Sequence, residues 1–209
     1  MTTAKEIAGS LLSIGAVHLR PDQPFTWTSG IKSPIYCDNR ITMSYPAVRR
    51  QIASAFAQLI RERYPQAQVV AGTATAGIPH AAWVAELLDL PMIYVRDKAK
   101  GHGRQNQIEG ALAAGQKVVV IEDLISTGGS SLKAAQAVQM EGGEVLGVVA
   151  IFSYQFPDAE QLFADAGIPC TTISQYTALL EAAREQGVIT AEQEQLLSEW
   201  RKSPRTFFA

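Results

Sequence analysis

The sequence predicts a single α/β domain whose parallel sheet is flanked by helices on both faces, with a small N-terminal hood. Three observations support this prediction. Strand-like and helix-like segments alternate along the middle of the chain, as they do in parallel sheets with helical connections. The aliphatic run at residues 118–121 is typical of a strand buried on both faces. The 209 residues, 47% of them hydrophobic, suffice for one full core.

Residues 1–45 are predicted to form the hood. Apolar side chains recur at helical spacing near the N-terminus and predict a helix there; they are Ile7, Leu11, Leu12 and Ile14. Residues 17–19 and 25–36 then favour short strands that Pro and Gly interrupt.

Residues 46–175 are predicted to form the core, and residues 176–209 a C-terminal helical part. Pro46 suits the first turn of a helix that ends near residue 64. Four strands are expected next, with helices between the first two and between the last two; the strands are 69–73, 92–96, 117–122 and 145–152. Two tail helices are expected at 176–186 and 191–200. Ligands of such sheets bind at the carboxyl ends of the strands, so we expect the site in the loops that follow them.

Charge and cysteine content limit the classes of partner. Eighteen Lys and Arg side chains against 20 Asp and Glu give a net charge of −2, which offers no global attraction to nucleic acid or an anionic membrane. Cys37 and Cys170 lie far apart and lack ligand-like spacing, which argues against a disulfide framework and a zinc site. No secretory signal or bilayer-spanning segment is recognisable. A cytoplasmic protein is therefore expected.

The most informative segment joins the strand at 117–122 to a loop rich in Ser, Thr and Gly. Small residues from Ser126 to Ser131 let a backbone approach an anion, and the helical spacing that follows places the free N–H groups at a helix N-terminus. Glu122 and Asp123 would repel a phosphate but suit the vicinal hydroxyls of a ribose. This combination indicates a ribose 5-phosphate site. The alternative is an ordinary capped turn; the Walker and dinucleotide patterns are both absent.

Residues 119–131 resemble the phosphoribosyl pyrophosphate (PRPP) signature of the type I phosphoribosyltransferases. The resemblance implies that Glu122 and Asp123 hold the ribose hydroxyls, with Asp123 also catalytic. It further implies that the next residues wrap the 5′-phosphate; these are Leu124, Ile125, Ser126, Thr127, Gly128, Gly129 and Ser130.

A second loop of small residues leaves the strand at 69–73. Taken alone, it is as readily a tight connection as a binding site. In the resembling family this position holds the pyrophosphate, so Thr73, Ala74 and Thr75 are expected to bind it.

The polar segment 96–110 is expected to be a closing lid, because it follows a strand, interleaves cations with glycines and is long for such a connection. The alternative is a solvated surface turn. Its Arg…Lys-x-His core resembles the orotate phosphoribosyltransferases. That resemblance implies a homodimer with shared active sites, in which the loop reaches the partner subunit. Arg96, Lys100 and His102 would then grip the pyrophosphate, and Lys100 and His102 would be catalytic.

Residues 28–38 resemble the Ser-Gly-x-Lys-Ser-Pro-x-Tyr segment of the same enzymes, which implies that Lys32 approaches orotate and PRPP. Two departures affect the contacts. Asp97 stands where many relatives have Lys, and no Arg follows the strand at 145–152 to meet the orotate carboxylate. Ser126 or backbone amides are the alternatives for that carboxylate. His18 and His80 are expected to be structural.

The resemblance as a whole implies transfer of ribose 5-phosphate from PRPP to N1 of orotate, giving orotidine 5′-monophosphate and pyrophosphate in de novo UMP biosynthesis. Mg²⁺ is the implied cofactor, bound mainly through pyrophosphate and ribose oxygens, with no metal-ligating residues assigned. Two alternatives stay open: the same reaction on a purine or uracil, and an RNA-binding regulator that keeps the PRPP pocket. Against the regulator, the sequence has no basic surface interleaved with aromatics and no helix-turn-helix segment.

Overall fold

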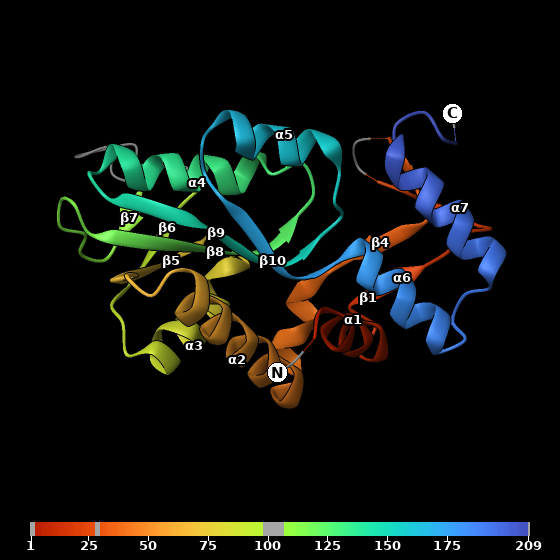
Figure 1. The fold of residues 1–209 in the computed structure, drawn as a ribbon, viewed down its shortest axis with the longest axis horizontal. Helices are drawn as coiled ribbons and strands as arrows, with labels where there is room; N and C mark the ends of the chain where they lie inside the picture. The colour runs from red at the N-terminus through yellow and green to blue at the C-terminus, as the bar shows by residue number, and fades with distance from the viewer. Residues whose placement is uncertain (1–2, 28–29, 98–106, 209) are drawn as a thin grey trace.

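A six-stranded sheet forms the centre of the computed structural model, which describes residues 3–27, 30–97 and 107–208 (Figure 1). Its strand order is β10–β9–β8–β5–β6–β7. The strands are β5 (Val69–Thr73), β6 (Met92–Val95), β7 (Ile108–Glu109), β8 (Lys117–Ile125), β9 (Glu144–Ser153) and β10 (Cys170–Gln175). All neighbours pair in parallel except β6 and β7, which are antiparallel. The predicted parallel sheet is confirmed, with one antiparallel edge strand added.

Helices cover both faces of this sheet. In Figure 1, α4 (Gly129–Met140) and α5 (Pro157–Asp165) lie over one face, and α2 (Pro46–Arg63) and α3 (Gly77–Leu88) over the other. Alternate residues of β8 enter different clusters: Val118 and Val120 pack with the α4 side, and Val119 and Ile121 with the α2 side. All four side chains are fully buried, a gain of roughly 1.5–3 kcal/mol each. This two-sided burial explains the unbroken aliphatic run.

The hood is built from the N-terminal segment and the C-terminal helices together. Its N-terminal elements are α1 (Ala4–Ser13), β1 (Val17–Leu19), β2 (Phe25–Thr26), β3 (Lys32–Ser33) and β4 (Ile35–Cys37). β1 pairs with β4 and β2 with β3, both antiparallel. α6 (Tyr176–Glu185) packs against α1, and α7 (Ala191–Lys202) lies beside α6 (Figure 1). The indole N–H of Trp200 donates to the Lys32 carbonyl at 3.2 Å, which ties α7 to β3.

Several elements differ from the expected ones. β8 runs to Ile125, so the acidic pair lies inside the strand and not at its end. The polar segment 96–110, expected to be a loop that closes as a lid, includes the short strand β7, which pairs with β6. The short 3-10 helix η1 (Asn39–Ser44), which joins the hood to α2, was not expected, nor were α5 and β10.

Candidate active site

The predicted 5′-phosphate loop lies between the end of β8 and the start of α4. Gly128 is the N-cap residue, with φ of 80° in the left-handed region. A Cβ at this position would lie 2.8 Å from Cε2 of Phe163, so the loop needs glycine for both its conformation and its packing. Gly128 has no side chain to cap the first turn of α4. The N-terminal amide groups are thus left for an anion, which the helix dipole also favours.

Glu122 and Asp123 occupy consecutive positions of β8, so their side chains start toward opposite faces of the sheet. The Glu122 carboxylate accepts from the Ser131 hydroxyl at 2.9 Å and from the Asp123 amide at 3.0 Å, and its residue is 5% exposed. Burial and the charge of Asp123 raise the Glu122 pKa. Asp123 is half-buried, and burial raises its pKa too. Of the two carboxylates, Asp123 is the more accessible to a ligand.

One cavity brings the two predicted phosphate loops together. It measures about 490 Å³ and is lined by Thr73, Arg96, Gly129, Ser130 and Lys133 among others. The Thr73 hydroxyl is buried and has no hydrogen-bond partner within the described residues. A buried hydroxyl without a protein partner costs free energy, which a hydrogen bond to a ligand oxygen would offset. Lys133, on the first turns of α4, was not predicted from the sequence, because a lone helical lysine carries no distinguishing signal.

The remaining residues of the pyrophosphate and lid predictions have different surroundings. Ala74 and Thr75 connect β5 to α3 through a cis peptide bond, and Thr75 is exposed. Arg96 contacts Glu109 of β7 at 3.5 Å. Lys100 and His102 lie outside the described residues, so their predicted roles stay predictions.

A second cavity, also about 490 Å³, lies between the hood and the loop after β8. Half of its lining residues are aromatic; the lining comprises Phe25, Thr26, Trp27, Tyr36, Cys37, Leu124, Ser126 and Tyr154. The predicted residue Ser126 is among them, whereas Lys32 is not and lies exposed on β3. Aromatic rings with a few polar atoms suit a flat heterocycle. The rings converge from β2, β4 and the end of β9, which only the tertiary fold reveals.

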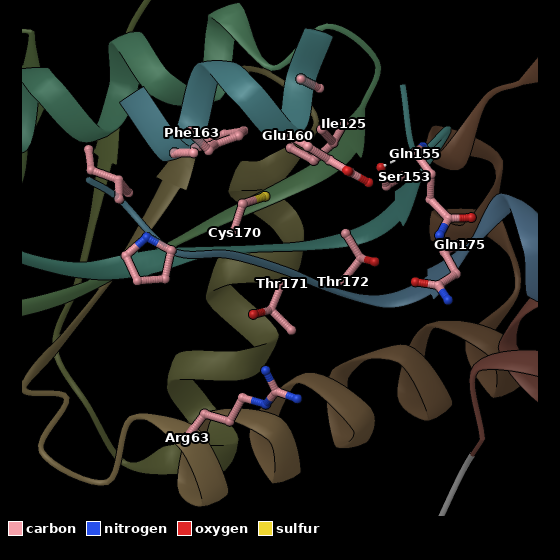
Figure 2. A pocket seen from close by; sticks show the side chains of 14 residues that line it. Arg63, Ile125, Ser153, Gln155, Glu160, Phe163, Cys170, Thr171, Thr172 and Gln175 are labelled. Carbon is pink, nitrogen blue, oxygen red and sulfur yellow. Dashed lines mark hydrogen bonds between the residues drawn. The ribbon is translucent and has the colours of Figure 1, made fainter. Parts of the chain in front are cut away.

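The side chains of two predicted PRPP-binding residues, Ile125 and Leu124, have different surroundings. Ile125 is 2% exposed and belongs to the core cluster on the α4 side. Leu124 faces the aromatic cavity described above. A further cavity of about 520 Å³ lies along β10 beneath α5 and is lined by Arg63, Glu160 and Thr172 among others (Figure 2). Of the predicted site residues, only Ile125 lines this cavity, and Glu122 and Asp123 do not.

Within residues 3–27, 30–97 and 107–208, no three His, Cys, Asp or Glu side chains cluster in a way that could hold a metal ion. Across the same ranges, every helix is too short or too polar to cross a bilayer.

Comparison with known proteins extends this picture over the whole chain. The family described as phosphoribosyl transferase domain matches residues 44–165. The orotate phosphoribosyltransferase of Enterococcus faecalis is 59% identical over 204 residues, which are 98% of this chain and 97% of the relative. The structure of Aeropyrum pernix orotate phosphoribosyltransferase has a TM-score of 0.76 at 28% identity and covers 88% of this chain and 99% of its own. Leishmania donovani UMP synthase has a TM-score of 0.81 at 29% identity; the match covers 95% of this chain and 42% of that longer one.

Proposed function

Because this chain belongs to the phosphoribosyl transferase family, among its orotate phosphoribosyltransferases, we propose that it transfers the ribosyl phosphate of PRPP to N1 of orotate. The products are orotidine 5′-monophosphate and pyrophosphate, a step of de novo UMP biosynthesis. One observation carries the proposal: the half-buried Asp123 carboxylate, two residues lining the aromatic cavity (Leu124 and Ser126) and the uncapped helix N-terminus at Gly128 all lie within residues 123–128. A phosphorylated ribose and a flat base need those three features side by side.

PRPP is proposed to lie across the carboxyl ends of β8 and β5. Residues 126–130 receive the 5′-phosphate at the N-terminus of α4. Asp123 accepts hydrogen bonds from the ribose hydroxyls. Glu122, on the α4 side, accepts a hydrogen bond from the main-chain amide of Asp123. The pyrophosphate extends toward Thr73 and Arg96, which line one cavity with Gly129 and Ser130. The buried, unpartnered hydroxyl of Thr73 supports this placement, because a pyrophosphate oxygen would satisfy it.

Orotate is proposed to occupy the aromatic cavity between the hood and β8. Trp27, Tyr36 and Tyr154 offer ring faces and edges for the pyrimidine, and Ser126 offers a hydroxyl at the side of the phosphate loop. Lys32 remains a proposed cation for orotate, although it is exposed on β3 outside this lining.

Catalysis is proposed to depend on orientation and electrostatics. The bond from C1′ to the pyrophosphate oxygen breaks, N1 of orotate bonds to C1′, and the N1 proton is lost. Asp123 steadies the ribose as positive charge grows at C1′. Arg96, with Lys100 and His102 of the loop, stabilises the departing pyrophosphate. Closure of that loop excludes water, which would otherwise hydrolyse the developing cation.

Mg²⁺ is the proposed cofactor. The half-buried Asp123 carboxylate fits an ion that substrate oxygens hold for the most part, and such an ion would neutralise charge on the pyrophosphate. We also propose a cytoplasmic homodimer in which Lys100 and His102 act in the neighbouring site.

A turnover assay tests the function. The protein is incubated with Mg²⁺, PRPP and one base at a time, and nucleotide formation is followed for orotate, uracil, adenine and guanine. Consumption of orotate with equimolar pyrophosphate release is expected. Turnover of another base in preference to orotate would assign a different substrate. No turnover of any base, together with RNA binding in a separate binding assay, would assign the regulator.

A further inference from the structure

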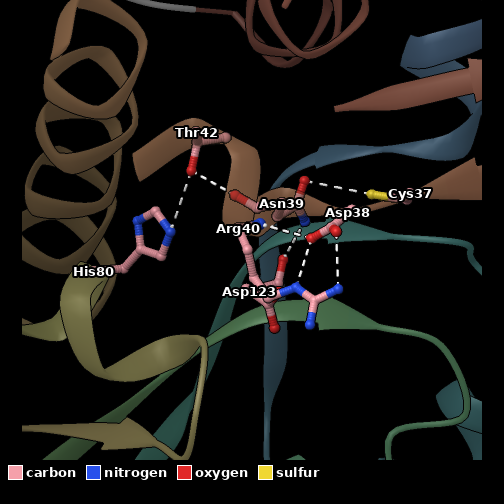
Figure 3. Close-up of polar contacts among 7 residues, drawn as sticks. All are labelled: Cys37, Asp38, Asn39, Arg40, Thr42, His80 and Asp123. Atoms are coloured by element: carbon pink, nitrogen blue, oxygen red, sulfur yellow. Dashed lines mark hydrogen bonds and ion pairs between the residues drawn. The ribbon is translucent and has the colours of Figure 1, made fainter. Parts of the chain in front are cut away.

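The turn η1 reaches from the hood to the acidic pair through the side chain of Asn39. Asn39 is 0% exposed, and its Nδ2 donates to the Asp123 carbonyl oxygen at 2.6 Å (Figure 3). Its Oδ1 accepts from the Cys37 thiol at 3.3 Å. Both ends of the amide are therefore engaged, and its orientation is fixed. The two residues are 84 positions apart in sequence, so this contact exists only in the folded chain.

The contact lies on the part of β8 that extends beyond its pairing with β5. Pairing with β5 ends at Ile121, opposite Gly72, while β8 continues to Ile125. Pairing with β9 passes from Glu122 to Leu124. The Asn39 amide thus bonds the main chain of Asp123 beyond the end of the β5 ladder. Asp123 lies on a stretch of β8 that is paired with β9 but no longer with β5, so without Asn39 its main chain would have one restraint fewer.

The turn itself is anchored to α3, the helix that follows the predicted pyrophosphate loop. The Thr42 hydroxyl donates to the Asn39 carbonyl at 2.6 Å and lies 3.4 Å from Nε2 of His80 (Figure 3). Because that hydroxyl proton is already used, Nε2 of His80 must be the donor in the second contact. His80 is 1% exposed, and burial lowers its pKa to about 4, so the ring is neutral at pH 7. Thr42 thus links the main chain of Asn39 to His80 of α3.

An ion pair adds rigidity at the solvent side of the turn. Asp38 accepts from the Arg40 amide at 3.1 Å and from its guanidinium at 2.7 and 2.8 Å (Figure 3). Asp38 is the N-cap residue of η1, and its bonds to Arg40 restrain the start of the turn, where Asn39 lies.

We propose that Asn39 is a positioning residue for the transfer reaction, acting through Asp123 without touching substrate. By holding the main chain of Asp123, it aims the carboxylate at the ribose hydroxyls. This inference rests on the proposed function. A small displacement of a catalytic group affects the transition state more than the bound substrate, so Asn39→Ala is expected to lower kcat by about 10- to 100-fold. The KM for PRPP is expected to change by less than about 3-fold.

The matched control is Ser174→Ala. Ser174 is 1% exposed and donates to the Ala4 carbonyl at 2.7 Å, so it also forms a buried bond from a side chain to a distant main-chain oxygen. Its bond lies at the junction of β10 and α1, away from Asp123. Ser174→Ala should lower the melting temperature, by less than Asn39→Ala because it removes one side-chain hydrogen bond instead of two, and it should leave kcat unchanged.

Steady-state kinetics on the wild type and both variants, with circular dichroism to establish folding, decides the inference. A selective loss of kcat in Asn39→Ala supports it. Equal kcat in the wild type and Asn39→Ala, or an equal loss in Ser174→Ala, overturns it while leaving the proposed function intact. If Asn39→Ala does not fold, Asn39→Ser removes the same bond with a smaller cavity and is judged by the same criteria. A folded wild type without orotate turnover would overturn the proposed function itself, and this inference with it.

Discussion

The phosphate loop requires glycine at position 128 for two separable reasons, and a set of three alanine variants separates them. Gly128→Ala places a side chain at φ of 80°, which costs about 1–2 kcal/mol for an L-residue. It also sets Cβ 2.8 Å from Phe163, a degree of overpacking that costs about 1–3 kcal/mol. The total is roughly 2–5 kcal/mol of unfolding free energy, or a fall of about 4–20 °C in Tm for a chain of this size.

Two other glycines supply the controls. Gly115 has φ of 79° and no atom within 4 Å of an added Cβ, so Gly115→Ala should show the backbone cost alone. Gly129 has neither a positive φ nor a close neighbour, so Gly129→Ala should be nearly neutral for stability. Urea and thermal unfolding measure all three, and calorimetry measures PRPP affinity. We expect Gly128→Ala to be the least stable and to lose at least about 10-fold in PRPP affinity through displaced loop amides. A Gly128→Ala protein as stable as Gly115→Ala would refute the packing argument.

Three further predictions concern the unpartnered hydroxyl of Thr73, the carboxyl group of Glu122 and the loop that carries Lys100. Thr73→Val should keep or raise Tm, because it removes an unsatisfied buried hydroxyl, yet weaken PRPP binding; a loss of stability with unchanged affinity would contradict the assignment. Glu122 has a native pKa above its unfolded value, so the native state binds more protons above about pH 4.5 and stability falls as pH rises toward that native pKa. Urea titrations at a series of pH values should show that the unfolding free energy falls less steeply with pH in Glu122→Gln than in the wild type. An unchanged dependence of the unfolding free energy on pH would mean that another group is responsible. Mixing inactive Lys100→Ala with inactive Asp123→Asn should restore activity through hybrid sites, and no recovery after proven subunit exchange would refute shared active sites.

The sequence predicted the elements whose side chains have a clear period or a continuous apolar run. The strands at 69–73 and 92–96 and the helix from Pro46 matched closely, because burial on two faces or along one stripe leaves a strong pattern. β10 was not predicted from the sequence, because it is an edge strand whose first residues, among them Thr171 and Thr172, are half-buried and form no aliphatic run. β7 is too short, at two residues, to show any period.

The site residues also divide into those with a local sequence pattern, which were predicted, and those without one, which were not. The loop after β8 was predicted because its glycines and hydroxyl residues are local in sequence. Tyr36, Trp27 and Asn39 were not chosen, since their relation to β8 arises only from the docking of the hood on the sheet. The sequence also assigned the ribose hydroxyls to both Glu122 and Asp123, whereas the structure directs Glu122 toward Ser131 and leaves Asp123, the residue also predicted to be catalytic, as the more accessible carboxylate.

The central claim, that residues 122–130 hold a ribose bearing a 5′-phosphate, is tested most directly by titrating PRPP into the folded protein with magnesium present. Isothermal calorimetry should show saturable binding at one PRPP per chain, weakened in Asp123→Asn. The absence of measurable binding to a protein that circular dichroism shows to be folded would contradict the account.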